Sequence, residues 1–146
     1  MRLYNIYMKR VYLSFSDEDA PKVKNLLPQL LSPEYELDFY EGPLDMDIDA
    51  PSAEAIKRVI GEKIVKCNMA VCLIGENTHK SKWVDSQLAK NRNKGNRIIA
   101  MALRKTESAV LPAVIKEENL TFYPWDPQRL KRIIAEDTGK LFVNST

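Results

Sequence analysis

The chain has 146 residues, of which 22 are basic and 20 are acidic, and 45% of the sequence is hydrophobic. This length predicts one domain over 1–146 that buries roughly two-thirds of its surface and needs no disulfides. The net charge of +2 argues against nucleic acid as a partner, and the apolar runs are too short to cross a membrane.

Residues 1–8 are predicted to be an N-terminal extension. They contain no long apolar stretch and no small-residue cleavage site, so we expect no secretion signal. The two cysteines, Cys67 and Cys72, do not have the spacing of a disulfide framework or of a paired metal site. These features together favour a reducing, cytoplasmic location.

The first predicted strand is Val11–Phe15, which is β-branched and aromatic and ends at Ser16. Ser16 is expected to cap a helix over 18–31, where leucines recur at helical spacing. Pro28 is the weak point of that helix, because proline lacks a backbone N–H. A short second strand is predicted over Glu36–Tyr40, and an acidic loop follows it.

The second helix is predicted to begin at Pro51. Its predicted buried stripe consists of Ala55, Ile56, Val59, Ile60, Ile64 and Val65. Met69–Ile74 is apolar without alternation, which is typical of a strand covered on both faces in a parallel sheet. A third helix is predicted over 82–94, with Ser81 as its cap and Gly95 as its stop.

The remaining predicted elements are a buried strand over 97–103, a weaker edge strand over Leu120–Tyr123 and a helix over 127–137. This alternation predicts a doubly wound α/β sheet of about five parallel strands with helices on both faces. With strand order 2-1-3-4-5, a ligand is expected at the carboxyl ends of the first and third strands, where the order reverses. Residues 14–17 and 75–78 flank that point.

Several catalytic signatures are missing from the sequence. It contains no glycine-rich dinucleotide motif, no P-loop, no zinc-hydrolase motif and no GxSxG motif. The single histidine, His79, is predicted to be a solvated loop residue rather than an acid or base. A receiver domain needs an aspartate after the third strand, where this chain has Gly75 and Glu76. We therefore expect no metal and no bound cofactor.

Three separated segments resemble one family. Residues 73–88 read LIGENTHKSKWVDSQL, residues 11–16 read VYLSFS, and residues 95–99 read GNRII. In this order they are similar to the TIR-like domain family, and most closely to the TIR-like subunit of the Thoeris anti-phage systems. The resemblance implies a flavodoxin-like TIR fold that cleaves the nicotinamide–ribose bond of NAD, its substrate, and forms an ADP-ribose-derived signal for a separate effector. It also implies self-association between TIR domains.

In the family, a glutamate four residues after the tryptophan holds the ribose of NAD. This chain has Trp83 followed by Gln87 at that position. A carboxylate suits the reaction because a fixed negative charge stabilises an oxocarbenium-like ribosyl centre. Gln87 keeps the shape without the charge, so we expect a weakened or inactive site that still binds NAD. Asp85 is a poor substitute, because it lies roughly 160–200° around the helix from both residues.

The resemblance and the predicted topology place further residues around the nucleotide. They are Ser14, Phe15, Ser16, Glu41, Asn77, Thr78 and Trp83. Structural roles are the alternatives: Phe15 and Trp83 as core residues, and Glu41 as part of a solvated turn. Two other interpretations of Gln87 stay open, namely an engineered replacement of a native glutamate, and a native glutamine in a non-catalytic TIR-like interaction or nucleotide-binding module.

Overall fold

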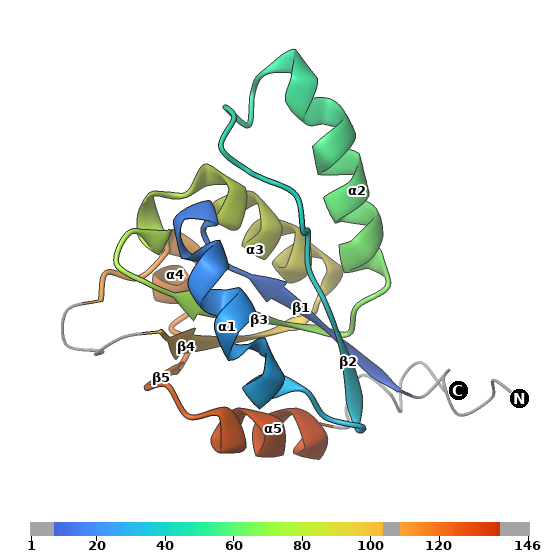
Figure 1. The fold of residues 1–146 in the computed structure, drawn as a ribbon, viewed down its shortest axis with the longest axis vertical. Helices are drawn as coiled ribbons and strands as arrows, with labels where there is room; N and C mark the ends of the chain where they lie inside the picture. The colour runs from blue at the N-terminus through green and yellow to red at the C-terminus, as the bar shows by residue number, and fades with distance from the viewer. Residues whose placement is uncertain (1–7, 104–108, 138–146) are drawn as a thin grey trace, which may run out of the picture.

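The computed structural model describes residues 8–103 and 109–137 (Figure 1). One parallel sheet has the strand order β2-β1-β3-β4-β5. The strands are β1 (Lys9–Ser14), β2 (Tyr35–Asp38), β3 (Met69–Ile74), β4 (Arg97–Ala102) and β5 (Phe122–Tyr123). The predicted doubly wound fold and its strand order are therefore confirmed. Of the expected N-terminal extension, residues 1–7 lie outside the described residues.

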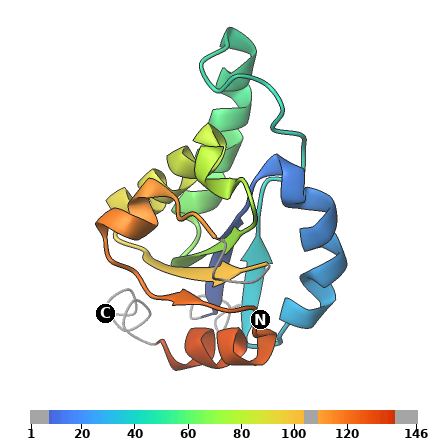
Figure 2. The ribbon, with the colours of Figure 1, turned by 90° about the vertical axis from the view of Figure 1, so that its left-hand side faces the viewer.

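Helices cover both faces of the sheet (Figures 1 and 2). The helices are α1 (Ala20–Leu30), α2 (Glu54–Val65), α3 (Lys82–Lys94), α4 (Ala113–Glu117) and α5 (Pro127–Glu136). The pair α1 and α5 packs on one face, and α2, α3 and α4 pack on the other. Because side chains alternate along a strand, Tyr12 and Ser14 face α2 and α3, whereas Leu13 and Phe15 face α1 and α5.

Several predicted boundaries are shifted in the structure, and β1 spans Lys9–Ser14 instead of the predicted Val11–Phe15. The strand β2 begins and ends earlier than the predicted Glu36–Tyr40, so Tyr40 belongs to the following loop. The helix predicted over 18–31 is a 3-10 turn at Asp17–Asp19 followed by α1, and Pro28 is accommodated near its end. Another 3-10 turn, at Pro51–Ala53, precedes α2. The spacing of hydrophobic residues locates a helix or strand but does not fix its terminal residues, which depend on local backbone geometry.

The predicted buried stripe of α2 is only partly correct. Ile60 and Ile64 are buried and Ile56 is half-buried, but Val59 and Val65 are 41% and 67% exposed, and Ala55 is also exposed. In Figure 1 the first turns of α2 extend beyond the edge of the sheet. Nothing in the described part of the chain packs on the outer side of this helix, so its buried face is narrower than the pattern predicted.

The helix α4 was missed by the sequence analysis, which predicted no element between 103 and 120. Val114 and Ile115 of this helix are buried against the α3 side of the sheet. Five residues are too few for a periodic pattern to emerge, which explains the omission. The edge strand β5 is also shorter than the predicted Leu120–Tyr123.

Both cysteines are free and buried. Burial raises the pKa of the Cys67 thiol and of the Cys72 thiol to about 12. Both thiols are therefore neutral core groups at physiological pH, in agreement with the predicted absence of a disulfide framework. None of the helices in the described ranges has the length and apolar character that crossing a bilayer requires.

The helix α3 has both of its predicted ends. The Ser81 hydroxyl oxygen accepts the backbone N–H of Val84 at 3.1 Å. Gly95 ends the helix with a φ of 86°, in the left-handed region that glycine adopts without strain. The helix that carries position 87 is thus fixed at both termini by local sequence.

Replacing Ser81 with alanine is expected to lower the free energy of unfolding by about 1 kcal/mol, because the Val84 N–H loses its acceptor. Denaturant titration followed by circular dichroism measures this change. Ser86→Ala, inside the same helix and away from the cap, is the matched control and should cost nothing. Equal losses in the two variants would show that the cap is not the cause.

Candidate functional site

Gln87 is held at the carboxyl end of β1 by a buried hydrogen bond. Its exposed fraction is 3%, and its Oε1 accepts the hydroxyl of Ser14 at 2.7 Å. Asn91, one turn later, donates from its side chain to the backbone carbonyl of Gln87 at 2.9 Å. Among the described residues, the side-chain nitrogen of Gln87 has no hydrogen-bond partner. The amide is therefore oriented through its oxygen, and its nitrogen is available to a ligand.

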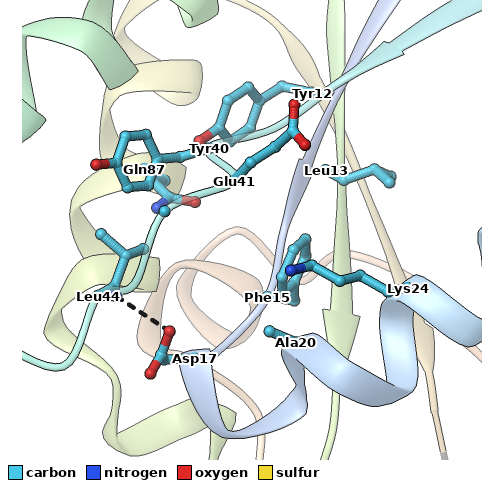
Figure 3. Close-up of a pocket in the computed structure, with 11 residues that line it drawn as sticks. Tyr12, Leu13, Phe15, Asp17, Ala20, Lys24, Tyr40, Glu41, Leu44 and Gln87 are labelled. Atoms are coloured by element: carbon cyan, nitrogen blue, oxygen red, sulfur yellow. Dashed lines mark hydrogen bonds between the residues drawn. The ribbon is translucent and has the colours of Figure 1, made fainter.

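The Gln87 side chain borders a small cavity at this end of the sheet (Figure 3). The walls come from β1, the first turns of α1, the loop after β2, and α3. They consist of Tyr12, Leu13, Phe15, Asp17, Ala20, Lys24, Tyr40, Glu41, Gly42, Leu44 and Gln87. The cavity volume is about 20 Å³, which is room for one or two water molecules. Three predicted site residues line the cavity, namely Phe15, Glu41 and Gln87, and a fourth, Ser14, lies behind it, bonded to Gln87.

Three aromatic rings contribute to the cavity walls. Tyr12, Phe15 and Tyr40 line it, and the Phe15 ring also packs on Phe39 with centroids 5.6 Å apart. Lys24 contributes a positive charge to the lining, and Asp17 and Glu41 contribute carboxylates. An aromatic cavity with a few polar groups is the usual form of a site for a flat organic ligand.

Ser16 and Thr78 lie in a separate polar cluster around Asp19. The Ser16 hydroxyl donates to Oδ2 of Asp19 at 3.0 Å, and the Thr78 hydroxyl lies 3.4 Å from the same oxygen. Thr78 also accepts the backbone N–H of Gly75 at 2.8 Å. Ser16 is the N-cap residue of the 3-10 turn Asp17–Asp19, as predicted, and its backbone carbonyl accepts the Asp19 N–H at 2.9 Å; its side chain, however, bonds to the Asp19 carboxylate instead of a backbone N–H. This cluster fills the space between the ends of β1 and β3.

Asn77 and Trp83 are also bonded within the protein. The Asn77 side chain donates to both carboxylate oxygens of Glu18, at 3.2 and 3.1 Å. The buried Trp83 donates its indole N–H to the backbone carbonyl of Met46 at 2.9 Å. Neither side chain borders the cavity at Gln87. The contacts that the structure gives them are internal, and their role toward a nucleotide stays a prediction.

Asp85 and His79 lie outside the cavity lining. Burial raises the pKa of the Asp85 carboxyl, and its Oδ1 is buried without a hydrogen-bond partner. His79 is half-buried, with an unpartnered Nδ1, so its side chain is less exposed than the predicted solvated loop residue. The 3-10 turn Thr78–Lys80 places this ring against the body of the protein. Asp85 is thus not positioned to replace the charge missing at Gln87.

Sequence reasoning missed Tyr12, Tyr40 and Lys24 as cavity residues. Tyr12 lies two positions before Ser14, and the alternation of strand side chains places both on the α3 face. That alternation was the available signal for Tyr12. Lys24 extends into the cavity lining from α1, and Tyr40 does so from the loop after β2. No sequence pattern predicts that either side chain lines the cavity. Within the described residues, no group of three or more His, Cys, Asp or Glu could hold a metal ion.

Comparison with known proteins gives a family and a fold. Residues 12–108 match the family described as Thoeris protein ThsB, TIR-like domain. The TIR domain of the Toll-related receptor TRR-2 from Hydra magnipapillata is similar with a TM-score of 0.55 and 17% identity, covering 84% of this chain and 89% of that one. The CMP N-glycosidase BcmB from Clostridium botulinum is similar with a TM-score of 0.54 and 16% identity, covering 86% and 97%. No curated protein matches significantly.

Proposed function

The chain belongs to the TIR-like domain family of the Thoeris protein ThsB, and on this basis we propose that its cavity at Gln87 is a nucleotide site. The proposed substrate is NAD, with the nicotinamide–ribose bond facing side chain 87. The placement of Gln87 carries the proposal, because the side chain is buried, oriented by Ser14 and on the wall of a cavity at the carboxyl end of β1. Ligands of doubly wound sheets bind at that end.

The chemistry explains why Gln87 weakens the site. Nicotinamide leaves as a neutral molecule and positive charge develops on the ribose, so a negative group nearby stabilises the transition state more than the substrate. The Gln87 oxygen is already bonded to Ser14, and the amide N–H₂ that remains carries partial positive charge. A glutamate in the same place would accept the Ser14 hydroxyl with one oxygen and present the other to the ribose.

Entry of a nucleotide requires the loop after β2 to move. A cavity of about 20 Å³ is far too small for a nicotinamide ring. Tyr40 folds over Gly42 so closely that a Cβ there would lie 2.7 Å from the phenol oxygen. The backbone N–H of Leu44 in this loop donates to the Asp17 carboxylate at 3.0 Å, which holds the loop against the 3-10 turn before α1 (Figure 3). Outward movement of Tyr40 would enlarge the cavity, and the charge of Lys24 in its lining suits the phosphates.

The structural similarity to a CMP N-glycosidase supports the same class of bond. CMP and NAD both join a ribose to a ring nitrogen of a flat heterocycle. In the proposed scheme the ADP-ribose-derived product activates a separate effector, and self-association of the TIR-like domain assists the reaction. Gln87 sets the rate of signal formation in this scheme.

Nicotinamide release from NAD, followed by mass spectrometry, tests the proposal. The chain is assayed as it is and as Gln87→Glu, at low concentration and at concentrations that favour self-association. Slow release by the first and faster release by the second are expected. The enzymatic proposal fails if neither protein releases nicotinamide under any of these conditions.

A second candidate is a module that binds a nucleotide without cleaving it. The neutral amide at position 87 is the observation that favours it, because binding needs shape and hydrogen bonds but no negative charge. Calorimetry and the nicotinamide assay together distinguish the two. A non-catalytic module binds NAD or ADP-ribose in the calorimeter, but its Gln87→Glu variant releases no nicotinamide.

A further inference from the structure

The hydroxyl group of Tyr12 is buried and has no hydrogen-bond partner. The residue is 0% exposed, and its phenol oxygen is one of the few buried polar atoms in the described residues that no donor or acceptor reaches. The backbone N–H of Tyr40 faces the phenol oxygen and acts to lower its pKa, but no acceptor in the described residues takes the phenol hydrogen. A buried tyrosine hydroxyl usually finds a partner, because leaving it unpaired costs free energy.

Tyr35 shows the usual arrangement in the same sheet. Its ring is also buried, and its hydroxyl donates to the backbone carbonyl of Leu30 at the end of α1. Both tyrosines are on neighbouring strands, and burial raises the pKa of each phenol. They differ in one respect that bears on function: the Tyr35 hydroxyl donates a hydrogen bond within the protein, and the Tyr12 hydroxyl does not.

Tyr12 borders the cavity next to Gln87. In Figure 3 its ring extends from β1 toward Tyr40 and the Gln87 amide. The phenol is neutral because burial raises its pKa and the nearby Asp38 carboxylate adds to that effect, so it keeps a proton to donate. The cavity therefore offers aromatic walls, a hydrogen-bond donor in Tyr12 and the side chain of position 87.

We propose that this cavity receives the leaving base of the nucleotide, a flat nitrogen heterocycle that bears a carbonyl group, and that Tyr12 donates a hydrogen bond to that carbonyl. The inference rests on the proposed function and names the group that the cavity recognises. Phe15 and Tyr40 flank the base, and Gln87 lies next to the ribose carbon to which it is attached. Nicotinamide and cytosine both have the required carbonyl, on the carboxamide and on the ring.

Calorimetry with paired ligands tests the role of Tyr12. One pair is NAD and ADP-ribose, and the other is CMP and ribose 5-phosphate, so the members of each pair differ in the base. The proteins are the unmodified chain, Tyr12→Phe and the matched control Tyr35→Phe. Tyr12→Phe should weaken binding of NAD or CMP about five- to tenfold, the effect of one lost hydrogen bond, and leave the base-free ligands unchanged.

Thermal unfolding separates this role from a structural one. Tyr12→Phe removes an unpartnered hydroxyl and should leave the unfolding midpoint unchanged or raise it, whereas Tyr35→Phe should lower it and spare ligand affinity. The affinity of Tyr12→Phe for NAD relative to ADP-ribose, and for CMP relative to ribose 5-phosphate, is compared with that of the unmodified chain. Equal values in the two proteins overturn the role of Tyr12 but not the nucleotide site. Absence of binding of all four ligands to the unmodified chain overturns the nucleotide site and this inference together.

Discussion

Gln87→Glu is expected to raise the rate of nicotinamide release from NAD by about 10²- to 10³-fold, the usual effect of one preorganised electrostatic group on a developing charge. Ser14 already holds the side-chain oxygen of position 87 at 2.7 Å and would hold one carboxylate oxygen in the same way. The change therefore adds negative charge at the ribose without moving the backbone. Initial rates at saturating NAD measure it, because the effect belongs to the transition state rather than to binding.

Ser86→Glu is the matched control for the added charge. It introduces the same carboxylate one residue earlier on α3, about 100° around the helix and outside the cavity lining. Its rate should equal that of the unmodified chain. Equal stimulation by both variants would mean that charge anywhere on this helix suffices, which contradicts a specific role for position 87.

Gly75→Ala is expected to destabilise the protein by about 2–3 kcal/mol, at the upper end of the usual cost of overpacking. A Cβ at Gly75 would overlap the carboxylate of Asp19. That carboxylate has little room to retreat, because Ser16 donates to it and Thr78 lies against it. The new methyl group therefore forces the ends of β1 and β3 apart. Denaturant unfolding followed by tryptophan fluorescence measures the loss.

Gly61→Ala is the same substitution in open space and serves as the control. Apart from the adjacent backbone of α2 itself, no atom lies within 4 Å of a Cβ at Gly61, so alanine should stabilise the protein by about 0.5–1 kcal/mol. Adding Asp19→Ala to Gly75→Ala should recover part of the loss, since it removes the overlapping group. If Gly75→Ala is as stable as Gly61→Ala, the packing described for the Asp19 cluster is incorrect.

The sequence predicted the sheet well because its signals are local and strong. Met69–Ile74 lacks alternation because both faces of β3 are covered, and Ser81 and Gly95 mark the ends of α3 by their own backbone chemistry. The exposure of Val59 and Val65 could not be predicted in the same way. It depends on how far α2 extends past the sheet, and periodicity within one helix does not contain that information.

The sequence predicted those site residues that lie at the carboxyl edge of the sheet, where the predicted topology brings strand ends and helix starts together. Ser14 and Gln87 meet because β1 and α3 end and begin at the same edge of the sheet. Ser16 and Thr78 lie at that edge too, but the buried Asp19 recruits them into a separate cluster. A short polar side chain has many partners within reach, so its contacts are decided by tertiary packing and not by its position in a motif.

A crystal structure of the unmodified chain with NAD bound is the most direct test of the site. We expect the nicotinamide ring to enter the cavity between Phe15 and Tyr40, with the adjoining ribose carbon in van der Waals contact with the Gln87 side chain. NAD seated elsewhere would contradict it, for example in the surface groove lined by Arg92, Arg97 and Tyr123, with the cavity at Gln87 unchanged.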